Sequence, residues 1–340
     1  MKPNPLRGVN NLLDNALGIC KSDIVLVACD PEKEELASAI SEQLKERGVS
    51  YSIECVDYDG KQIPHKLAEK MLDDHHNVIL LFFSKSIWHQ KERRIAKHEK
   101  KKRVVSYAGT LQMLSDGPAL ANPRKIKKLC DDLKLHIENE KTILLEGPNG
   151  TRIKGRCSGI GFETGLYTKP GEGGNFPSGE IYALGLIDES VEGFVHSNIK
   201  VKYLGLSAPG NDAVFDVRQA RIFPVKDKPA DRFFSFIKDC PELFYVGELA
   251  FGICPYYKVF EFPGSIQEEK LLGTAHVGLG ANISFGGNRK GKHMDIVFGP
   301  ASVTIDDKQI IINGKINPQY LSDKSRAWMR EMNYLAGEGG

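Results

Sequence analysis

Residues 24–47, IVLVACDPEKEELASAISEQLKER, decide the fold of the first part of the chain. The run IVLVAC at residues 24–29 is continuously apolar, which is typical of a strand buried on both faces of a parallel sheet. Residues 31–47 have helical periodicity; Asp30 before them is an expected N-cap, and Gly48 stands where a C-cap is expected. A strand followed directly by a helix predicts one unit of an α/β sheet.

The same alternation continues to about residue 140. Further strands are expected at residues 51–55, 77–83 and 104–107, and helices at residues 65–72, 87–100 and 123–136. This order predicts an α/β N-terminal domain with a doubly wound parallel sheet, at residues 1–140. The turn after the first strand, ACDPEKEE, has no glycine and offers no phosphate cradle. We therefore expect a scaffold that supports a dimer or covers a substrate, rather than a nucleotide-binding domain.

The composition changes after about residue 139, where glycines become frequent and long helices disappear. Strands are expected at residues 142–145, 152–157, 180–184, 199–203, 213–217, 276–279, 295–298 and 302–305, and a helix at residues 230–239. Asp306-Asp307 and Asn313-Gly314 are typical of tight hairpin turns. Residues 141–340 are therefore predicted to form a mostly antiparallel α+β C-terminal domain.

Composition and charge exclude several classes of protein. The net charge of the 340 residues is only +2, which gives no reason to expect a nucleic-acid or membrane partner. No segment approaches the ~18 consecutive apolar residues of a membrane span, and the N-terminus lacks the apolar core of a signal peptide. The seven cysteines form no CxxC pair, so neither a disulfide framework nor a cysteine-ligated zinc is expected. We expect a cytoplasmic protein.

Four glycine-rich segments of the second domain carry acids and histidines. They are GGNFPSGE at residues 173–180, VGELAFG at 246–252, GTAHVGLGAN at 273–282 and GKHMD at 291–295. We interpret them as turns in which glycine lets the backbone approach a ligand closely. His293 and Asp295 are two positions apart, so on a strand both face the same side. The segment SFGGN at residues 284–288 is expected to turn the chain back and bring His276 beside them.

These segments together supply two histidines and three carboxylates. The candidate ligands are Glu180, Glu248, His276, His293 and Asp295. Such a set suits a divalent ion such as zinc, cobalt, manganese or iron. Three carboxylates balance most of the charge of two such ions, so one or two ions are expected, with a carboxylate-bridged pair as one arrangement. A single Gly-Glu or a single histidine is more often structural, so the prediction depends on their joint occurrence.

The same segments resemble the aminopeptidase T / PepS family of metallopeptidases. The resemblance covers residues 173–314. It is carried by Asn175-Phe-Pro-Ser-Gly-Glu180, Gly247-Glu248-Leu, Glu269-Lys270 before Gly273-Thr-Ala-His276, Gly280-Ala-Asn282, Gly286-Gly287 and His293-Met-Asp295. It implies a dinuclear metal centre held by Glu180, Glu248, His276, His293 and Asp295. It also implies a homodimeric enzyme that uses zinc, cobalt or manganese to remove N-terminal amino acids from peptides.

Two positions depart from the family pattern. Ala281 stands where shorter members have an acid, and Ile283 stands where longer members have a catalytic tyrosine. An offshoot of the family resembles a mononuclear iron dioxygenase that opens hydroxylated pyridine rings. His276, His293 and Asp295 would supply the two-histidine, one-carboxylate triad of such an enzyme.

Our leading hypothesis is an aminopeptidase-like metal-dependent hydrolase acting on a peptide or small-molecule substrate. Glu248 is the expected catalytic residue, both as a metal ligand and as the group that takes a proton from water. The ring-cleaving iron dioxygenase is one alternative. A non-catalytic member of the family that binds a ligand or partner is the other.

Overall fold

The computed structural model describes residues 4–85, 87, 90–115, 117–201, 205–206, 213–225, 231–255 and 268–337. The chain forms two compact units, Met1–Lys127 with Thr164–Ser178, and Lys128–Glu163 with Gly179–Gly340. The expected division into residues 1–140 and 141–340 has a single boundary, whereas the chain passes between these units three times. No helix among the described residues is long and apolar enough to cross a membrane.

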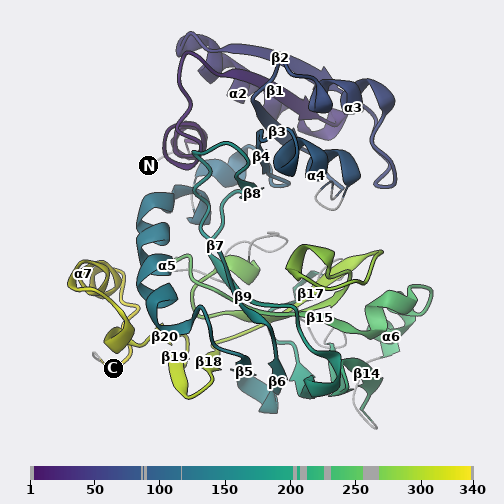
Figure 1. Ribbon diagram of the computed structural model, residues 1–340, viewed down its shortest axis with the longest axis vertical. Coiled ribbons are helices and arrows are strands. Elements are labelled where there is room, and N and C mark those ends of the chain that lie inside the picture. Colours follow the sequence, from purple (N-terminus) through teal and green to yellow (C-terminus); the bar gives the residue numbers. More distant parts are fainter. Residues whose placement is uncertain are drawn as a thin grey trace. The chain divides into compact units, whose positions relative to one another are not determined.

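The first unit contains a five-stranded sheet in the order β2–β1–β3–β4–β8, with every neighbouring pair parallel. Its strands are β1 (Ile24–Cys29), β2 (Ser50–Cys55), β3 (Val78–Phe82), β4 (Arg103–Ser106) and β8 (Gly173–Asn175). The helices of this part of the chain are α1 (Leu6–Asn10), α2 (Glu34–Glu46), α3 (His65–Leu72), α4 (Lys91–His98) and α5 (Pro123–Ile137), which ends in the second unit. The predicted α/β parallel sheet is confirmed (Figure 1).

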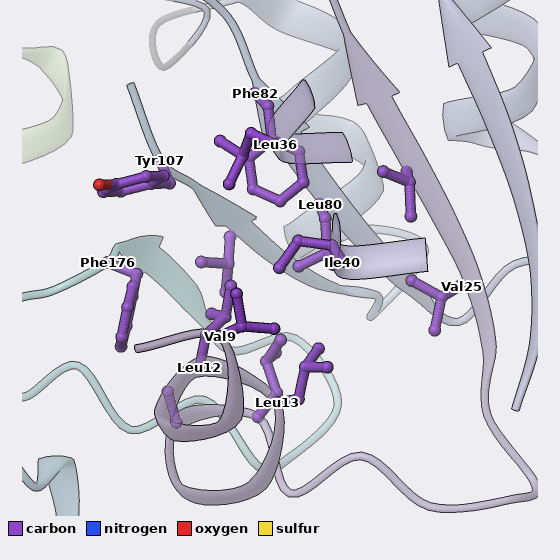
Figure 2. Close-up of a cluster of buried hydrophobic side chains, with 14 of the residues drawn as sticks. Val9, Leu12, Leu13, Val25, Leu36, Ile40, Leu80, Phe82, Tyr107 and Phe176 are labelled. Carbon is purple, nitrogen blue, oxygen red and sulfur yellow. The ribbon is translucent and has the colours of Figure 1, made fainter. Parts of the chain in front are cut away.

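Helices cover both faces of this sheet, because alternate side chains of β1 and β3 enter two different cores. Figure 2 shows one core, in which Leu36 and Ile40 of α2 lie near Leu80 and Phe82 of β3. The other core contains Leu26, Ala28, Ile79 and Leu81 from the same strands, with Leu67 and Met71 of α3 and Ala96 of α4. Burial on both faces explains why these strands are continuous apolar runs.

The structure corrects two local predictions and confirms a third. Asp30 makes no capping bond; its carboxylate accepts the backbone N–H of Ser84 at 2.6 Å, and a short 3-10 turn, Pro31–Lys33, precedes α2. The helix expected at residues 87–100 is shorter, since α4 covers Lys91–His98, and residues 88 and 89 lie outside the described residues. The expected C-cap is confirmed, because Gly48 has a φ of +66° and its N–H donates to the Lys45 carbonyl oxygen.

Strand β8 was not expected, because its sequence is GGN and was interpreted as a turn. A side chain at Gly173 would collide with the carbonyl oxygen of Val104 on the neighbouring strand β4. Glycine is therefore required for close strand pairing at this position rather than for a turn.

The second unit contains two sheets, and every strand pair in them is antiparallel. An eight-stranded sheet consists, in spatial order, of β14 (Arg221–Pro224), β13 (Val214–Arg218), β10 (Glu192–His196), β6 (Arg152–Arg156), β5 (Thr142–Glu146), β18 (Ser302–Ile305), β19 (Lys308–Ile312) and β20 (Lys315–Ile316). A seven-stranded sheet consists of β12 (Gly205–Leu206), β11 (Lys200–Val201), β17 (His293–Phe298), β16 (Ala275–Gly280), β15 (Val246–Gly252), β9 (Glu180–Leu184) and β7 (Gly159–Glu163). The predicted antiparallel domain is confirmed.

Both expected hairpin turns are present. Residues 306 and 307 connect β18 to β19, and residues 313 and 314 connect β19 to β20, with φ values of +50° at Asp306, +48° at Asn313 and +80° at Gly314. Among the described residues of this unit, the sheets are accompanied by the end of α5 and by the helices α6 (Asp231–Ile237) and α7 (Asp323–Glu331). Residue 230 of the expected helix and residues 202 and 203 of the strand expected at 199–203 lie outside the described residues.

Candidate metal centre

The candidate ligands lie on four neighbouring strands of the seven-stranded sheet, in the order β17–β16–β15–β9. His293 and Asp295 are on β17, His276 is on β16, Glu248 is on β15, and Glu180 is the first residue of β9. The interpretation of their segments as turns is therefore wrong for VGELAFG, which is the buried strand β15, and for most of GTAHVGLGAN, which forms β16. The expected reversal at residues 284–288 is confirmed by the antiparallel pairing of β16 with β17.

The strand register places all five side chains on one face of the sheet. Gly278 of β16 stands opposite both Glu248 and Asp295, and directly opposite residues of paired strands point to the same face. His276 is two positions before Gly278 on β16, and His293 is two positions before Asp295 on β17, so both histidines share this face. Glu180 joins them because it stands opposite Gly252, four positions after Glu248 on β15.

Gly278 lies in the middle of the group of donors, and its lack of a side chain leaves space between them. A Cβ atom there would lie 2.7 Å from His293 Cε1 and 2.8 Å from Glu248 Oε2. Such distances do not occur between non-bonded atoms, so the donors can approach one another only because this residue has no side chain. The space that a side chain would fill is thus bordered by a histidine ring and a carboxylate.

The donor atoms form two groups of three. Glu180, Glu248 and His276 make up one group, and Glu248, His293 and Asp295 make up the other, with the ligand atoms of each group within 4.8 Å of one another. Glu248 belongs to both groups. Glu180, Glu248 and His276 are at most 2% exposed and Asp295 is 7% exposed, so water screens these charges little.

His293 is held by both ring nitrogens. Its Nδ1 lies 2.8 Å from the carbonyl oxygen of Ala281, which can only accept, so Nδ1 carries the hydrogen. Its Nε2 then faces Asp295 Oδ1 at 2.8 Å and Glu248 Oε2 at 3.1 Å. A lone pair directed at two carboxylates needs a cation between them, either a proton or a metal ion. Orientation of a histidine through its second nitrogen is typical of metal ligands.

His276 is oriented differently. Its Nε2 lies 3.0 Å from Glu180 Oε1 and 3.7 Å from Glu248 Oε1, and its Nδ1 is buried without a hydrogen-bond partner among the described residues. Glu248 Oε1 likewise accepts no hydrogen bond there. Buried polar atoms are normally satisfied, so an unmatched carboxylate oxygen facing a histidine nitrogen is an arrangement suited to binding a cation.

Electrostatics around the site agree with its geometry. Burial opposes charge on the two imidazoles, but the surrounding carboxylates outweigh burial and raise the pKa of His276 and His293 to about 10. Burial also opposes charge on Glu248, yet the two neighbouring histidines lower the pKa of its carboxyl to about 2. Without a metal, protons on the histidines compensate the acids, and a bound ion would replace them.

Lys270 also lies beside the site, although the sequence predicted no role for this residue. It lies on a short 3-10 turn, Glu268–Lys270, and its Nζ is 2.6 Å from Glu180 Oε1. Burial lowers the pKa of this ammonium group, but Glu180 and other nearby acids outweigh burial and hold the pKa above its usual value. The Glu269-Lys270 pair before His276 was the only signal in the sequence that could have found it.

The two departures from the family pattern lie next to the site. Ala281 contributes its backbone carbonyl to His293, so this contact does not require an acidic side chain at position 281. Ile283 begins a 3-10 turn, Ile283–Phe285, within the connection between β16 and β17. Asn282 stabilises that connection, since its Oδ1 accepts the backbone N–H of Arg289 at 2.9 Å.

The similarity of this chain to known proteins is a similarity of fold. No family model matches the chain, and no curated protein sequence matches it. A solved structure of 2,5-dihydroxypyridine dioxygenase from Pseudomonas putida KT2440 superposes with a TM-score of 0.74 at 12% identity, covering 92% of this chain and 97% of that one. AmpT from Thermus thermophilus, an aminopeptidase, superposes with a TM-score of 0.60 at 14% identity, covering 92% and 98%. The chain therefore has a fold that it shares with a dioxygenase and with an aminopeptidase.

Proposed function

We propose that this protein is a metal-dependent hydrolase of the aminopeptidase kind, which removes N-terminal residues from peptides. Its metal ligands are Glu180, Glu248, His276, His293 and Asp295. The observation that carries the proposal is that two groups of three donors share Glu248. A carboxylate common to two donor groups is the arrangement expected for a pair of divalent ions ~3.5–4 Å apart.

Zinc, cobalt or manganese bound there would supply a water molecule of lowered pKa and polarise a substrate carbonyl group. Glu248 is the residue we assign to proton transfer, because one of its oxygens is unmatched while the other faces His293. Asp295 and Glu180 add negative charge to the same face, which favours a substrate with a free α-ammonium group.

Replacing Glu248 with glutamine tests its assigned role. The variant keeps the shape of the side chain but loses negative charge and basicity, so turnover should fall by about 10²-fold or more. Turnover is measured on protein reconstituted with metal, with bound metal quantified for each sample. Wild-type turnover in a metal-replete variant would remove Glu248 from catalysis. Gln309→Glu, on the eight-stranded sheet, is a control that is expected to leave turnover unchanged.

The ring-cleaving iron dioxygenase is the second candidate. It is supported by the TM-score of 0.74 with a dioxygenase and by the presence of two histidines and an aspartate in the site. The geometry favours it less, because neither donor group found among the described residues combines His276 with His293 and Asp295.

A substrate panel separates the two reactions. We expect the cobalt or manganese form to release amino acids from short unblocked peptides equally in air and without oxygen, since hydrolysis needs only water and a Lewis acid. N-acetylated peptides should resist, because acetylation removes the positive amine. Hydroxypyridines are assayed beside the peptides, with oxygen consumption followed in the iron form. Oxygen uptake with hydroxypyridine, together with no peptide release in any metal form, would establish the dioxygenase instead.

A further inference from the structure

The proposed metal centre contains a buried cation that its chemistry does not use. Lys270 places its ammonium 2.6 Å from Glu180 Oε1, and only 10% of its side chain is exposed. The same oxygen is 3.0 Å from His276 Nε2. A metal ion on the His276 side and the Lys270 ammonium would therefore need the same carboxylate oxygen.

The two donor groups are not equivalent in their distances. On one side, His293 Nε2 lies 2.8 Å from Asp295 Oδ1 and 3.1 Å from Glu248 Oε2. On the other, His276 Nε2 lies 3.0 Å from Glu180 Oε1 but 3.7 Å from Glu248 Oε1. The donors around His293 are the more closely gathered, and Asp295 is not the acid that Lys270 contacts.

Charge balance separates the two groups further. Among the five donors and Lys270, three carboxylates carry three negative charges and Lys270 carries one positive charge, so with neutral histidines one divalent ion balances these six side chains. Glu163 and Glu269 add negative charge near Lys270, but they are only partly buried, so water screens them more. A second divalent ion would leave an excess of positive charge among the six side chains themselves, which are nearly fully buried. Uncompensated charge in such a place is costly unless a group moves or loses its proton.

We propose that Lys270 makes the two halves of the site unequal. One divalent ion binds tightly to Glu248, His293 and Asp295, and a second binds weakly to Glu180, Glu248 and His276, because it must displace the Lys270 ammonium from Glu180. This inference rests on the metal centre assigned under Proposed function. It identifies Lys270 as the residue that sets how many ions the protein holds at a given metal concentration.

Titration of the metal-free, full-length protein with Mn²⁺ tests the inference, using calorimetry and elemental analysis after dialysis. We expect wild type to bind one ion at least about 100-fold more tightly than the second, since water screens charges little at a buried site and the second ion must displace the Lys270 ammonium. In Lys270→Gln the second ion should bind at least about tenfold more tightly than in wild type. Lys270→Arg keeps the charge and should behave as wild type. Lys308→Gln removes a lysine that pairs with Glu140 in the same unit and should have no effect.

Three results would contradict the inference. Two equally tight ions in wild type would show that Lys270 imposes no difference, and unchanged or weaker second binding in Lys270→Gln would show that the ammonium does not compete. Absence of any binding in wild type would overturn the metal centre itself. If Lys270→Gln does not fold, Glu180→Gln decides: it should lose the second ion and keep the first within about threefold, whereas loss of both refutes the assignment.

Discussion

Glu248→Ala is expected to abolish binding of both metal ions, whereas substitutions on either side of it abolish only one. Glu248 is the single residue common to the two donor groups, so its removal takes a ligand from each. His293→Ala should lower affinity at the Asp295 side, and His276→Ala at the Glu180 side. Loss of a partner that only orients a ligand already costs about 10–100-fold in affinity, so loss of a ligand should cost more than about 100-fold.

The measurement is metal content per chain after reconstitution and dialysis, together with circular dichroism to verify folding. Thr304→Val, on the other sheet of the same unit, is the control and should retain wild-type content. A Glu248→Ala protein that is folded and still binds a full complement of metal would show that the shared carboxylate is not a ligand. Absence of metal in reconstituted wild type would refute the centre as a whole.

Gly278→Ala should be nearly as damaging as the loss of a ligand, although it adds only a methyl group. The new Cβ atom would lie 2.7 Å from His293 Cε1 and 2.8 Å from two atoms of Glu248, including Oε2. Contacts this short force the histidine and the carboxylate apart, and overpacking of this kind typically costs about 1–3 kcal/mol of stability. We expect metal affinity to fall by more than about 100-fold, because both donors in contact belong to the His293 side of the site.

Gly159→Ala provides the matched control. Gly159 lies on β7 of the same sheet, and a Cβ atom there would meet only the Glu138 carbonyl oxygen at 3.4 Å, which is ordinary contact. Metal affinity is measured by titration, and the free energy of unfolding by urea denaturation. Wild-type affinity in Gly278→Ala would show that the donors do not need the space above this glycine.

The sequence predicted the local parts of this structure. Period-two spacing put His293 and Asp295 on one face, and the turn at residues 284–288 correctly paired their strand with that of His276. The joint approach of Glu180 and Glu248 could not be read from spacing, since it depends on the order and register of strands far apart in the chain. Those two acids were named as candidate ligands because each follows a glycine and because of the family resemblance, not because spacing placed them together.

Most errors in the secondary structure predicted around the site came from glycine residues that were interpreted as turns. Gly247 and Gly252 suggested a turn around Glu248, yet both lie in the interior strand β15. A Cβ atom at Gly247 would be 2.7 Å from the Gly280 carbonyl oxygen, and one at Gly252 would collide with the backbone at residue 271. Close approach between backbones requires glycine just as a turn does, so the two cannot be told apart from the sequence. The role of Lys270 was hidden for a related reason, because only the folded 3-10 turn brings it to Glu180.

The common face of the five donors makes the site sensitive to strand alignment. If β15 or β17 slipped by one residue against β16, its side chains would move to the opposite face of the sheet and its donors would leave the cluster. A misaligned sheet therefore cannot bind the ion, and an ion that binds stabilises the correct alignment alone. Metal binding would therefore favour the native strand register while the second unit folds. It would add to the register preference that the apolar residues of these strands provide by themselves.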